Sequence, residues 1–241
     1  MSILVLTAME VDKKTLLSAM QNIDELPLIN GGIIYRGTLD GRRFFLVESG
    51  IGKVNAAMTC ALAIAACGDE ISLIINSGVA GALLPDQKPC DIVISEDVRY
   101  HDVNVCAFGH ALGQVPFQPP VFDADKDAVQ ACLRICEKSG YPVRVGQIIT
   151  GDRFIEDEKT VKELSAHFPH ALAVEMEGAA VGHVAHRCGK PFLVIRAISD
   201  CSDNNAKGSY EKFLHEAAQH SETIVRGFVN AEKNTQCSSE R

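Results

Sequence analysis

Two carboxylates, Glu175 and Glu177, stand two residues apart directly after the apolar run Ala171–Val174. Small residues and then a helix-like spacing of apolar residues follow, which predicts a buried strand that turns into a helix. Carboxylates are rarely buried without a partner or a task. Because open α/β sheets bind their ligands where strands end, this pair marks the first candidate functional site.

Polar or glycine-rich residues also follow most of the other predicted strands. These sets are Met9 with Asp12, Ser49–Gly52, Ser77–Gly81, Thr150–Ile155 and Arg196–Asp200. If the strands are parallel, all of these sets lie at one edge of the sheet and form one site. The site would hold several carboxylates, one arginine and an aromatic ring. It would hold neither a Cys/His metal cluster nor a nucleophilic serine elbow.

A site of this composition suits hydroxyl recognition and proton transfer. Ionised carboxylates accept hydrogen bonds from the hydroxyl groups of a sugar. One carboxylic acid can protonate a leaving group while another carboxylate orients or deprotonates water. Glycosidic cleavage divides its steps in this way, through an oxocarbenium-like transition state. Phe154 offers a ring face on which a flat base can stack.

The glycine-rich turn Gly50–Val54 does not match a nucleotide-phosphate motif. A P-loop requires glycine at position 47 and serine or threonine at position 54, and valine stands at both. A dinucleotide fingerprint that starts at Gly50 requires glycine or alanine at position 55, where the chain has Asn55. The glycines are better explained by a backbone that lies close to a ligand or to a neighbouring strand.

The elements that position these residues alternate between strands and helices, with no Pro/Gly/Ser-rich linker between them. This alternation predicts one α/β domain over residues 1–230, with a largely parallel sheet and helices on both faces, followed by a polar tail at 231–241. The pair Asp40-Gly41 predicts a hairpin that adds an antiparallel element. Three prolines in residues 113–122 predict an irregular loop that serves as a subunit contact or a lid.

The overall composition excludes several classes of partner. The chain has 241 residues and a formal net charge of −8, which argues against nucleic acid or an anionic membrane as the main partner. Its nine cysteines are scattered without a CxxC pair, which favours a reducing cytoplasm over a disulfide framework. Cys132 and Cys136 could share a metal, but core packing explains them better. No secretory signal and no membrane span are expected.

Seven short motifs occur in an order and at spacings that resemble the bacterial 5′-methylthioadenosine/S-adenosylhomocysteine nucleosidases of the purine nucleoside phosphorylase-like superfamily. They are Ala8-Met9-Glu10, Ser49–Val54, Arg99–Asp102, Ala107–Gly109, Gly151–Ile155, Val174–Glu177 and Arg196–Asp200. The resemblance covers about residues 2–229. It implies a three-layer α/β/α sandwich with a mixed central sheet, acting in the cytoplasm as a homodimer without cofactor or metal.

The resemblance also implies a reaction, the hydrolysis of the adenine–ribose bond by water in methionine salvage and S-adenosylmethionine recycling. Asp200 would serve the adenine leaving group, and Glu177 would hold the ribose hydroxyls. Arg196 would help to place the water and Glu177. The water-activating residue, usually glutamate in this family, would be Asp12.

Further substrate contacts are implied by the same resemblance. Phe154 would stack on adenine, the backbone of Ile155 would bind its edge, and Met176 would pack on the sugar. The other expected contacts are Met9, Ile51, Val79 (in place of the usual serine), Gly81, Glu175, Ser199 and Tyr210. Phe108 and Pro116 would cover the 5′-alkylthio group in the site of the partner subunit.

Three alternatives remain open at this point. The first is a relative that uses phosphate as the nucleophile, although only Lys53, near a glycine-rich turn, and Arg99 would supply the additional positive charge that phosphate requires. The second is a nucleosidase for another adenine nucleoside, such as 6-amino-6-deoxyfutalosine or 5′-deoxyadenosine. The third is a nucleoside-binding protein without catalysis, which the shorter side chain of Asp12 brings into consideration.

Overall fold

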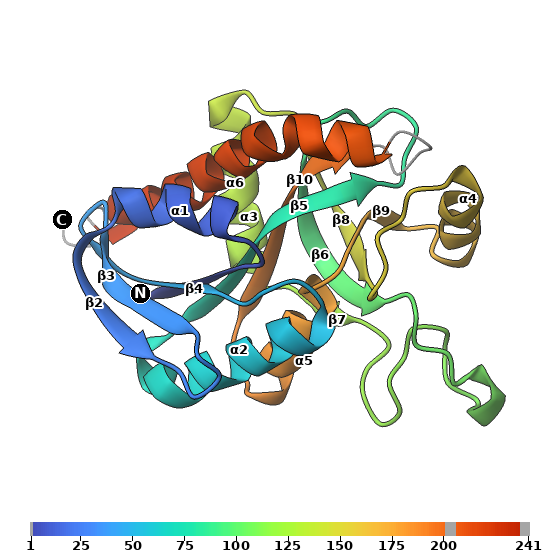
Figure 1. Cartoon of the computed structure of the whole chain (residues 1–241), viewed down its shortest axis with the longest axis horizontal. Helices are drawn as coiled ribbons and strands as arrows, with labels where there is room; N and C mark the ends of the chain where they lie inside the picture. Colours follow the sequence, from blue (N-terminus) through green and yellow to red (C-terminus); the bar gives the residue numbers. More distant parts are fainter. Residues whose placement is uncertain (1, 201–205, 237–241) are drawn as a thin grey trace.

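The computed structural model describes residues 2–200 and 206–236, with side chains from 2–200 and 208–230. A twisted ten-stranded sheet lies between two layers of helices (Figure 1). The strands are β1 (Ile3–Thr7), β2 (Gln21–Pro27), β3 (Ile33–Leu39), β4 (Arg42–Glu48), β5 (Leu73–Ala82), β6 (Ile92–Tyr100), β7 (Phe122–Asp123), β8 (Val143–Thr150), β9 (Ala171–Glu175) and β10 (Phe192–Asp200). The expected α/β sandwich with a mixed sheet is confirmed.

The sheet is partly closed on itself. Its strand order is β10-β6-β8-β9-β5-β1-β4-β3-β2, and β10 also pairs with β5, so that β5, β10, β6, β8 and β9 form a ring. The hairpin of β3 and β4 at Asp40-Gly41 is present as expected. Since β1, β5 and β10 are mutually parallel neighbours around β5, their carboxyl ends lie together.

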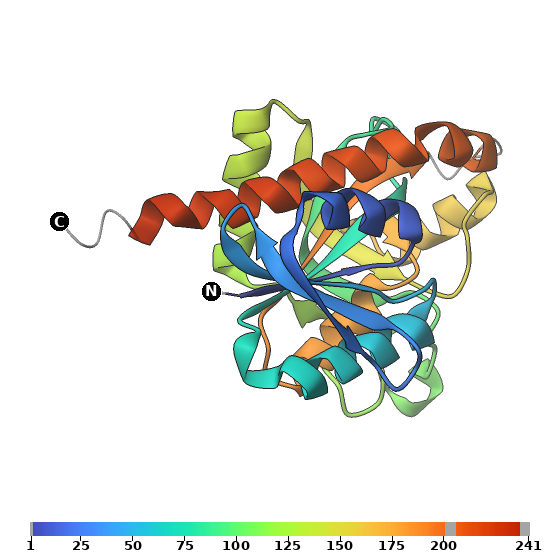
Figure 2. The same ribbon diagram turned by 60° about the vertical axis from the view of Figure 1, so that its left-hand side comes forward.

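Two groups of helices cover the sheet. Helices α1 (Glu10–Ala19), α3 (Lys126–Ser139) and α6 (Ala206–Gln236) form one layer, and α2 (Lys53–Cys67) and α5 (Gly178–Arg187) pack together in the other. Figure 2 shows α6 running along the whole first layer beside α1, with its C-terminal end projecting beyond the sheet. Helix α4 (Glu158–His167) and the short helical turns η1 (Gly68–Glu70) and η2 (Cys106–Phe108) lie in connections.

Several expectations from the sequence need correction. The sheet is not largely parallel, because five of its strand pairs are antiparallel and five are parallel. The segment Ser77–Gly81 is part of β5 and does not follow it as a turn. Helix α6 runs to Gln236 and so includes the first residues of the polar tail. The polar sequence Cys201–Lys207 predicts a loop after β10, and it falls largely on residues 201–205, outside the described residues.

Among the described residues, no helix combines the length and the apolar character that a membrane crossing requires.

Glycine at position 182 allows α5 to pack closely against the sheet. A Cβ atom there would lie 2.7 Å from Cγ2 of Val98 and 2.9 Å from the ring of Phe192. We therefore expect Gly182→Ala to lower the free energy of unfolding by about 1–3 kcal/mol, although alanine favours a helix by roughly 1 kcal/mol over glycine. Urea unfolding measures this difference, and an alanine variant more stable than the parent would contradict the packing.

Candidate active site

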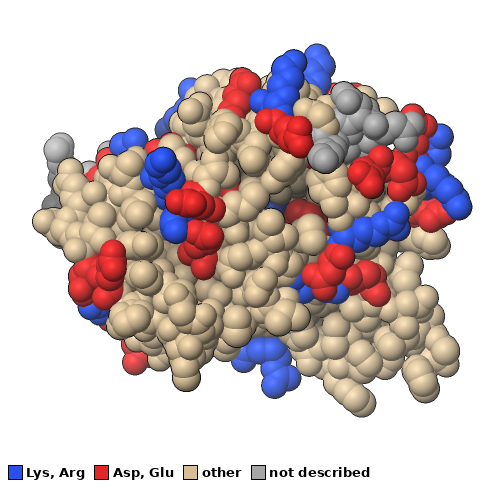
Figure 3. Space-filling view, viewed as in Figure 1, with Lys and Arg blue, Asp and Glu red and all other residues tan. Residues whose placement is uncertain are grey.

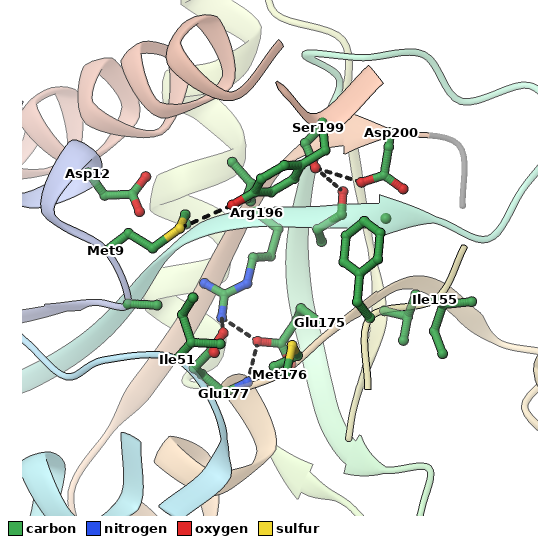
Figure 4. A pocket seen from close by; sticks show the side chains of 18 of the residues that line it. Met9, Asp12, Ile51, Ile155, Glu175, Met176, Glu177, Arg196, Ser199 and Asp200 are labelled. Carbon is green, nitrogen blue, oxygen red and sulfur yellow. Dashed lines mark hydrogen bonds and ion pairs between the residues drawn. The ribbon is translucent and has the colours of Figure 1, made fainter. Parts of the chain in front are cut away.

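A cavity of ≈ 290 Å³ opens at the carboxyl ends of β1, β5, β9 and β10. Its volume lies near the lower end of the roughly 300–1,000 Å³ that is typical of small-molecule sites. Figure 3 shows a hollow near the middle of this face, with charged atoms recessed inside it. Figure 4 shows Asp12 and Met9 on one side of the cavity, Ser199 and Asp200 on another, and Glu175 and Glu177 across from both.

All of the site residues named from the sequence line this cavity except Phe108 and Pro116. Phe108 belongs to η2 in the long connection between β6 and β7, and its side chain is exposed. Six further residues line the cavity without having been named as individual substrate contacts. They are Ala8, Ser77, Gly78, Ala80, Arg153 and Val174. All six fall within the strand-end sets or the motifs that the sequence had marked, so those segments predicted the cavity better than the individual contacts did.

Arg196 is the buried cation of the cavity, with a relative exposure of 1%. Its Nη2 donates to the carboxylate of Glu175 and to Oδ1 of Asn76, the latter at 2.5 Å. Its Nη1 lies 3.3 Å from the carbonyl oxygen of Asn76. Asn76 in turn donates from Nδ2 to the carbonyl of Leu6 at 3.2 Å. The guanidinium therefore connects β10 to β9, β5 and, through Asn76, β1.

Glu175 is the partner that balances the charge of Arg196. One carboxylate oxygen accepts a hydrogen bond from Thr150, and the other accepts the backbone N–H groups of Glu177 at 3.0 Å and Gly178 at 2.7 Å. These amides begin α5, where the helix dipole favours a negative charge. Glu175 is thus fully occupied by the protein itself, so the two carboxylates of the opening motif are not equivalent.

Glu177 is held at the cavity wall by the glycine-rich turn before α2. The N–H of Gly52 donates to Oε1 of Glu177 at 2.8 Å, and Oε2 lies 3.8 Å from Nη2 of Arg196. Gly52 has φ = 96°, a conformation that favours glycine. Burial raises the pKa of Glu177, the negative charge of Glu175 raises it further, and Arg196 opposes both effects. This carboxyl group is therefore poised to exchange its proton near neutral pH.

Asp12 is buried in the first turn of α1. Burial raises its pKa from 3.8 to about 6, with Arg196 lowering it and Glu48 raising it. Both carboxylate oxygens are buried, and neither has a hydrogen-bond partner among the described residues. A buried carboxylate without such partners at a cavity wall is suited to receive a proton from a molecule in that cavity.

Asp200 reaches the cavity because β10 is irregular at its end. Ile198 pairs with Ala80 and Asp200 pairs with Gly81, so Ser199 is an extra residue in β10. Such a bulge redirects the side chains that follow it. The hydroxyl of Ser199 donates to Oδ2 of Asp200 at 2.8 Å, which helps to fix the orientation of this carboxyl group.

Apolar and aromatic side chains also line the cavity. The hydroxyl of Tyr210, from α6, donates to the sulfur of Met9 at 3.1 Å. The ring of Phe154 lies edge-on to the ring of Tyr210 at a centroid distance of 5.8 Å. Ile155 is buried beside them, whereas Ile51 is 52% exposed. The cavity thus combines an acidic wall with an apolar wall that reaches the surface.

Residues 2–230 match the model of the phosphorylase superfamily, and this range includes all ten strands and every lining residue of the cavity. The chain belongs to the phosphorylase superfamily.

Individual relatives within this superfamily cover nearly the full chain. The 5′-methylthioadenosine/S-adenosylhomocysteine nucleosidase of Anoxybacillus flavithermus is 41% identical over 95% of this chain and 98% of its own length. The crystal structure of the corresponding nucleosidase from Neisseria meningitidis, in complex with methylthio-immucillin-A, superposes with a TM-score of 0.91 at 38% identity, covering 95% and 99% of the two chains. A futalosine hydrolase from Helicobacter pylori superposes with a TM-score of 0.89 at 30% identity, covering 95% and 97%.

The raised pKa of Asp12 has a consequence for the stability of this superfamily member. The folded state holds the proton of Asp12 up to about pH 6, whereas the unfolded state releases it near 3.8. Stability from this group is therefore complete below about pH 4 and is lost as the pH rises through 6. We expect Asp12→Asn, which cannot ionise, to gain up to about 3 kcal/mol relative to the parent between pH 4 and pH 7.5. Urea unfolding at both values measures it, and a difference independent of pH would contradict the assigned burial.

Proposed function

We propose that this chain hydrolyses the N-glycosidic bond of 5′-methylthioadenosine and S-adenosylhomocysteine, releasing adenine for methionine salvage and S-adenosylmethionine recycling. The observation that carries the proposal is the meeting of three buried carboxylates, Asp12, Glu177 and Asp200, around one small cavity with an apolar end. The nucleosidase relatives, alike in sequence over nearly the whole chain, support the same reaction.

Each carboxylate has a distinct task in the proposed reaction. Glu177 accepts hydrogen bonds from the ribose hydroxyls and stabilises the positive charge that develops on the sugar. Asp12, with a pKa of about 6, is mostly ionised at neutral pH and takes a proton from the attacking water. Asp200 directs a proton to adenine as the bond breaks, with Ser199 fixing its orientation.

The apolar wall accounts for the proposed substrate class. Phe154 stacks on adenine and the backbone of Ile155 binds the edge of the base, while Met176 packs on the sugar. Met9, Ile51 and Tyr210 surround a thioether at the 5′ position, where soft apolar groups make favourable contacts with sulfur. Val79 and Gly81 complete the floor on β5.

The charges around the cavity support water as the nucleophile over phosphate. Its described lining residues include two cations, Arg153 and Arg196. Arg196 is already paired with Glu175, and the exposed Arg153 lies 3.3 Å from Asp157. Lys53 does not line the cavity, and its Nζ lies 2.6 Å from the carboxylate of Asp102. A phosphate dianion requires cationic groups that are not already neutralised.

The phosphate dependence of adenine release tests the reaction type. We expect 5′-methylthioadenosine to yield adenine and free 5-methylthioribose at the same rate with and without phosphate, as followed by chromatography. Formation of a sugar 1-phosphate that requires phosphate would overturn the hydrolase assignment. A panel with 6-amino-6-deoxyfutalosine and 5′-deoxyadenosine compares values of kcat/KM, and a preference for either would favour the alternative substrate class.

The role of Asp200 has a test of its own. We expect Asp200→Asn to lower kcat by about 10²–10⁴-fold, the usual contribution of a positioned acid or base. Asp123→Asn on the short strand β7, exposed and outside the cavity, is the matched control and keeps its activity. Asp12→Glu is expected to retain activity and Asp12→Asn to lose it. An active Asp200→Asn enzyme would remove Asp200 from the acid role.

We further propose a cytoplasmic homodimer in which Phe108 and Pro116 complete the cavity of the partner subunit. Phe108 is 82% exposed and Phe117, in the same connection, is 97% exposed. Large exposed apolar side chains of this kind mark interaction surfaces. The cysteines at positions 60, 67, 90, 106, 132, 136 and 188 are free thiols, which suits a reducing compartment.

A further inference from the structure

Three side chains with metal-ligating atoms meet outside the cavity, beside α6. Glu216 and His220 lie one helical turn apart on α6, and Cys90 comes from the connection between β5 and β6. One ligand atom from each residue lies within 4.8 Å of the others. None of the three lines the cavity, and the proposed hydrolysis uses none of them.

The backbone around Cys90 holds this cluster in place. Cys90 has φ = 74°, a left-handed conformation that costs free energy for any residue with a Cβ atom. Its N–H donates to the carbonyl of Ile198 at 2.7 Å, and its own carbonyl accepts from Nδ1 of His220 at 3.2 Å. Backbone carbonyls orient metal-bound histidines in the same way. The ring of Tyr141 lies 4.3 Å from the ring of His220 and restricts it further.

We propose that Cys90, Glu216 and His220 form a binding site for a divalent transition-metal ion, of which Zn²⁺ fits best. A thiolate, an imidazole and a carboxylate are the three ligand types that zinc takes from proteins, and a water molecule would complete the tetrahedron. Calcium and magnesium prefer oxygen ligands throughout. Zinc–ligand lengths place neighbouring ligand atoms roughly 3.3–3.7 Å apart. Side-chain rotations that move the ligand atoms by about an ångström would therefore bring them to zinc-binding distances.

The position of the cluster suggests a structural clamp. Cys90 is bonded to β10 at Ile198, two residues before Asp200, and Ser221 on α6 donates to the carbonyl of Gly78 in β5 at 3.2 Å. A metal ion here would fasten α6 to the strands that form the cavity, close to where α6 presents Tyr210. We expect bound metal to raise stability and to leave kcat within about twofold of the metal-free value.

Metal titration of the chelator-treated, metal-free protein tests the site. With Zn²⁺ at 100 times its Kd, we expect the thermal midpoint to rise by about 5–10 °C. With Co²⁺, we expect one equivalent to bind with a thiolate-to-cobalt absorption band. Cys90→Ser should abolish the band, and Glu216→Gln and His220→Gln should weaken binding at least tenfold.

Matched variants make the outcome decisive. Cys188→Ser and His215→Gln change an exposed thiol and an exposed imidazole outside the cluster and should bind Co²⁺ like the parent. The proposal is overturned if the parent shows neither the band nor the thermal shift, or if Cys90→Ser retains both. Adenine release is assayed in parallel on each variant, so failure of the metal site is separate from failure of the proposed hydrolysis.

Discussion

The ion pair between Arg196 and Glu175 is the constraint on which the rest of the structure depends. A guanidinium with 1% relative exposure is costly to remove from water, so its charge must be balanced and its terminal nitrogens hydrogen-bonded within the protein. Glu175 supplies the charge, and Asn76 accepts from both terminal nitrogens. Removing one partner of such a pair typically costs about 3–5 kcal/mol. Because these residues come from β10, β9 and β5, the pair also fixes how the closed part of the sheet meets at the cavity.

The same cation sets the chemistry of the cavity wall. Glu175 accepts hydrogen bonds from Arg196, Thr150 and the first amides of α5, so both of its oxygens are bonded within the protein. Glu177 and Asp12 are buried without comparable compensation, and burial raises the pKa of each while Arg196 opposes the rise. The proposed reaction needs groups of this second kind, because they exchange protons near neutral pH. Glu175, which has a structural role, and Glu177, which is proposed to take part in the reaction, thus stand two residues apart in one motif.

Local sequence patterns predicted much of the fold and of the cavity. They failed where a contact depends on strands or residues that are far apart in the sequence. The apolar runs of β1, β8 and β10 were recognisable because burial on both faces leaves a continuous signal. β2 was missed, since nearly all of its side chains are exposed. The motifs contained most of the lining residues. The hydrogen bonds of Asn76 to Arg196 and of Thr150 to Glu175 could not be predicted, because they depend on how β5 pairs with β10 and β8 pairs with β9. The Cys90 cluster could not be recognised for the same reason, because Cys90 is more than a hundred residues from Glu216 and His220 in the sequence.

The most direct test of this account is the titration of the Asp12 and Glu177 carboxyl carbons by ¹³C NMR in the parent, Arg196→Gln and Arg196→Lys, with near-ultraviolet circular dichroism to verify folding. The account predicts that Arg196→Gln raises both pKa values, because the opposing positive charge is gone, and that Arg196→Lys leaves them close to those of the parent. Unchanged pKa values in a folded Arg196→Gln protein would contradict the claim that this buried cation controls the proton affinity of the cavity.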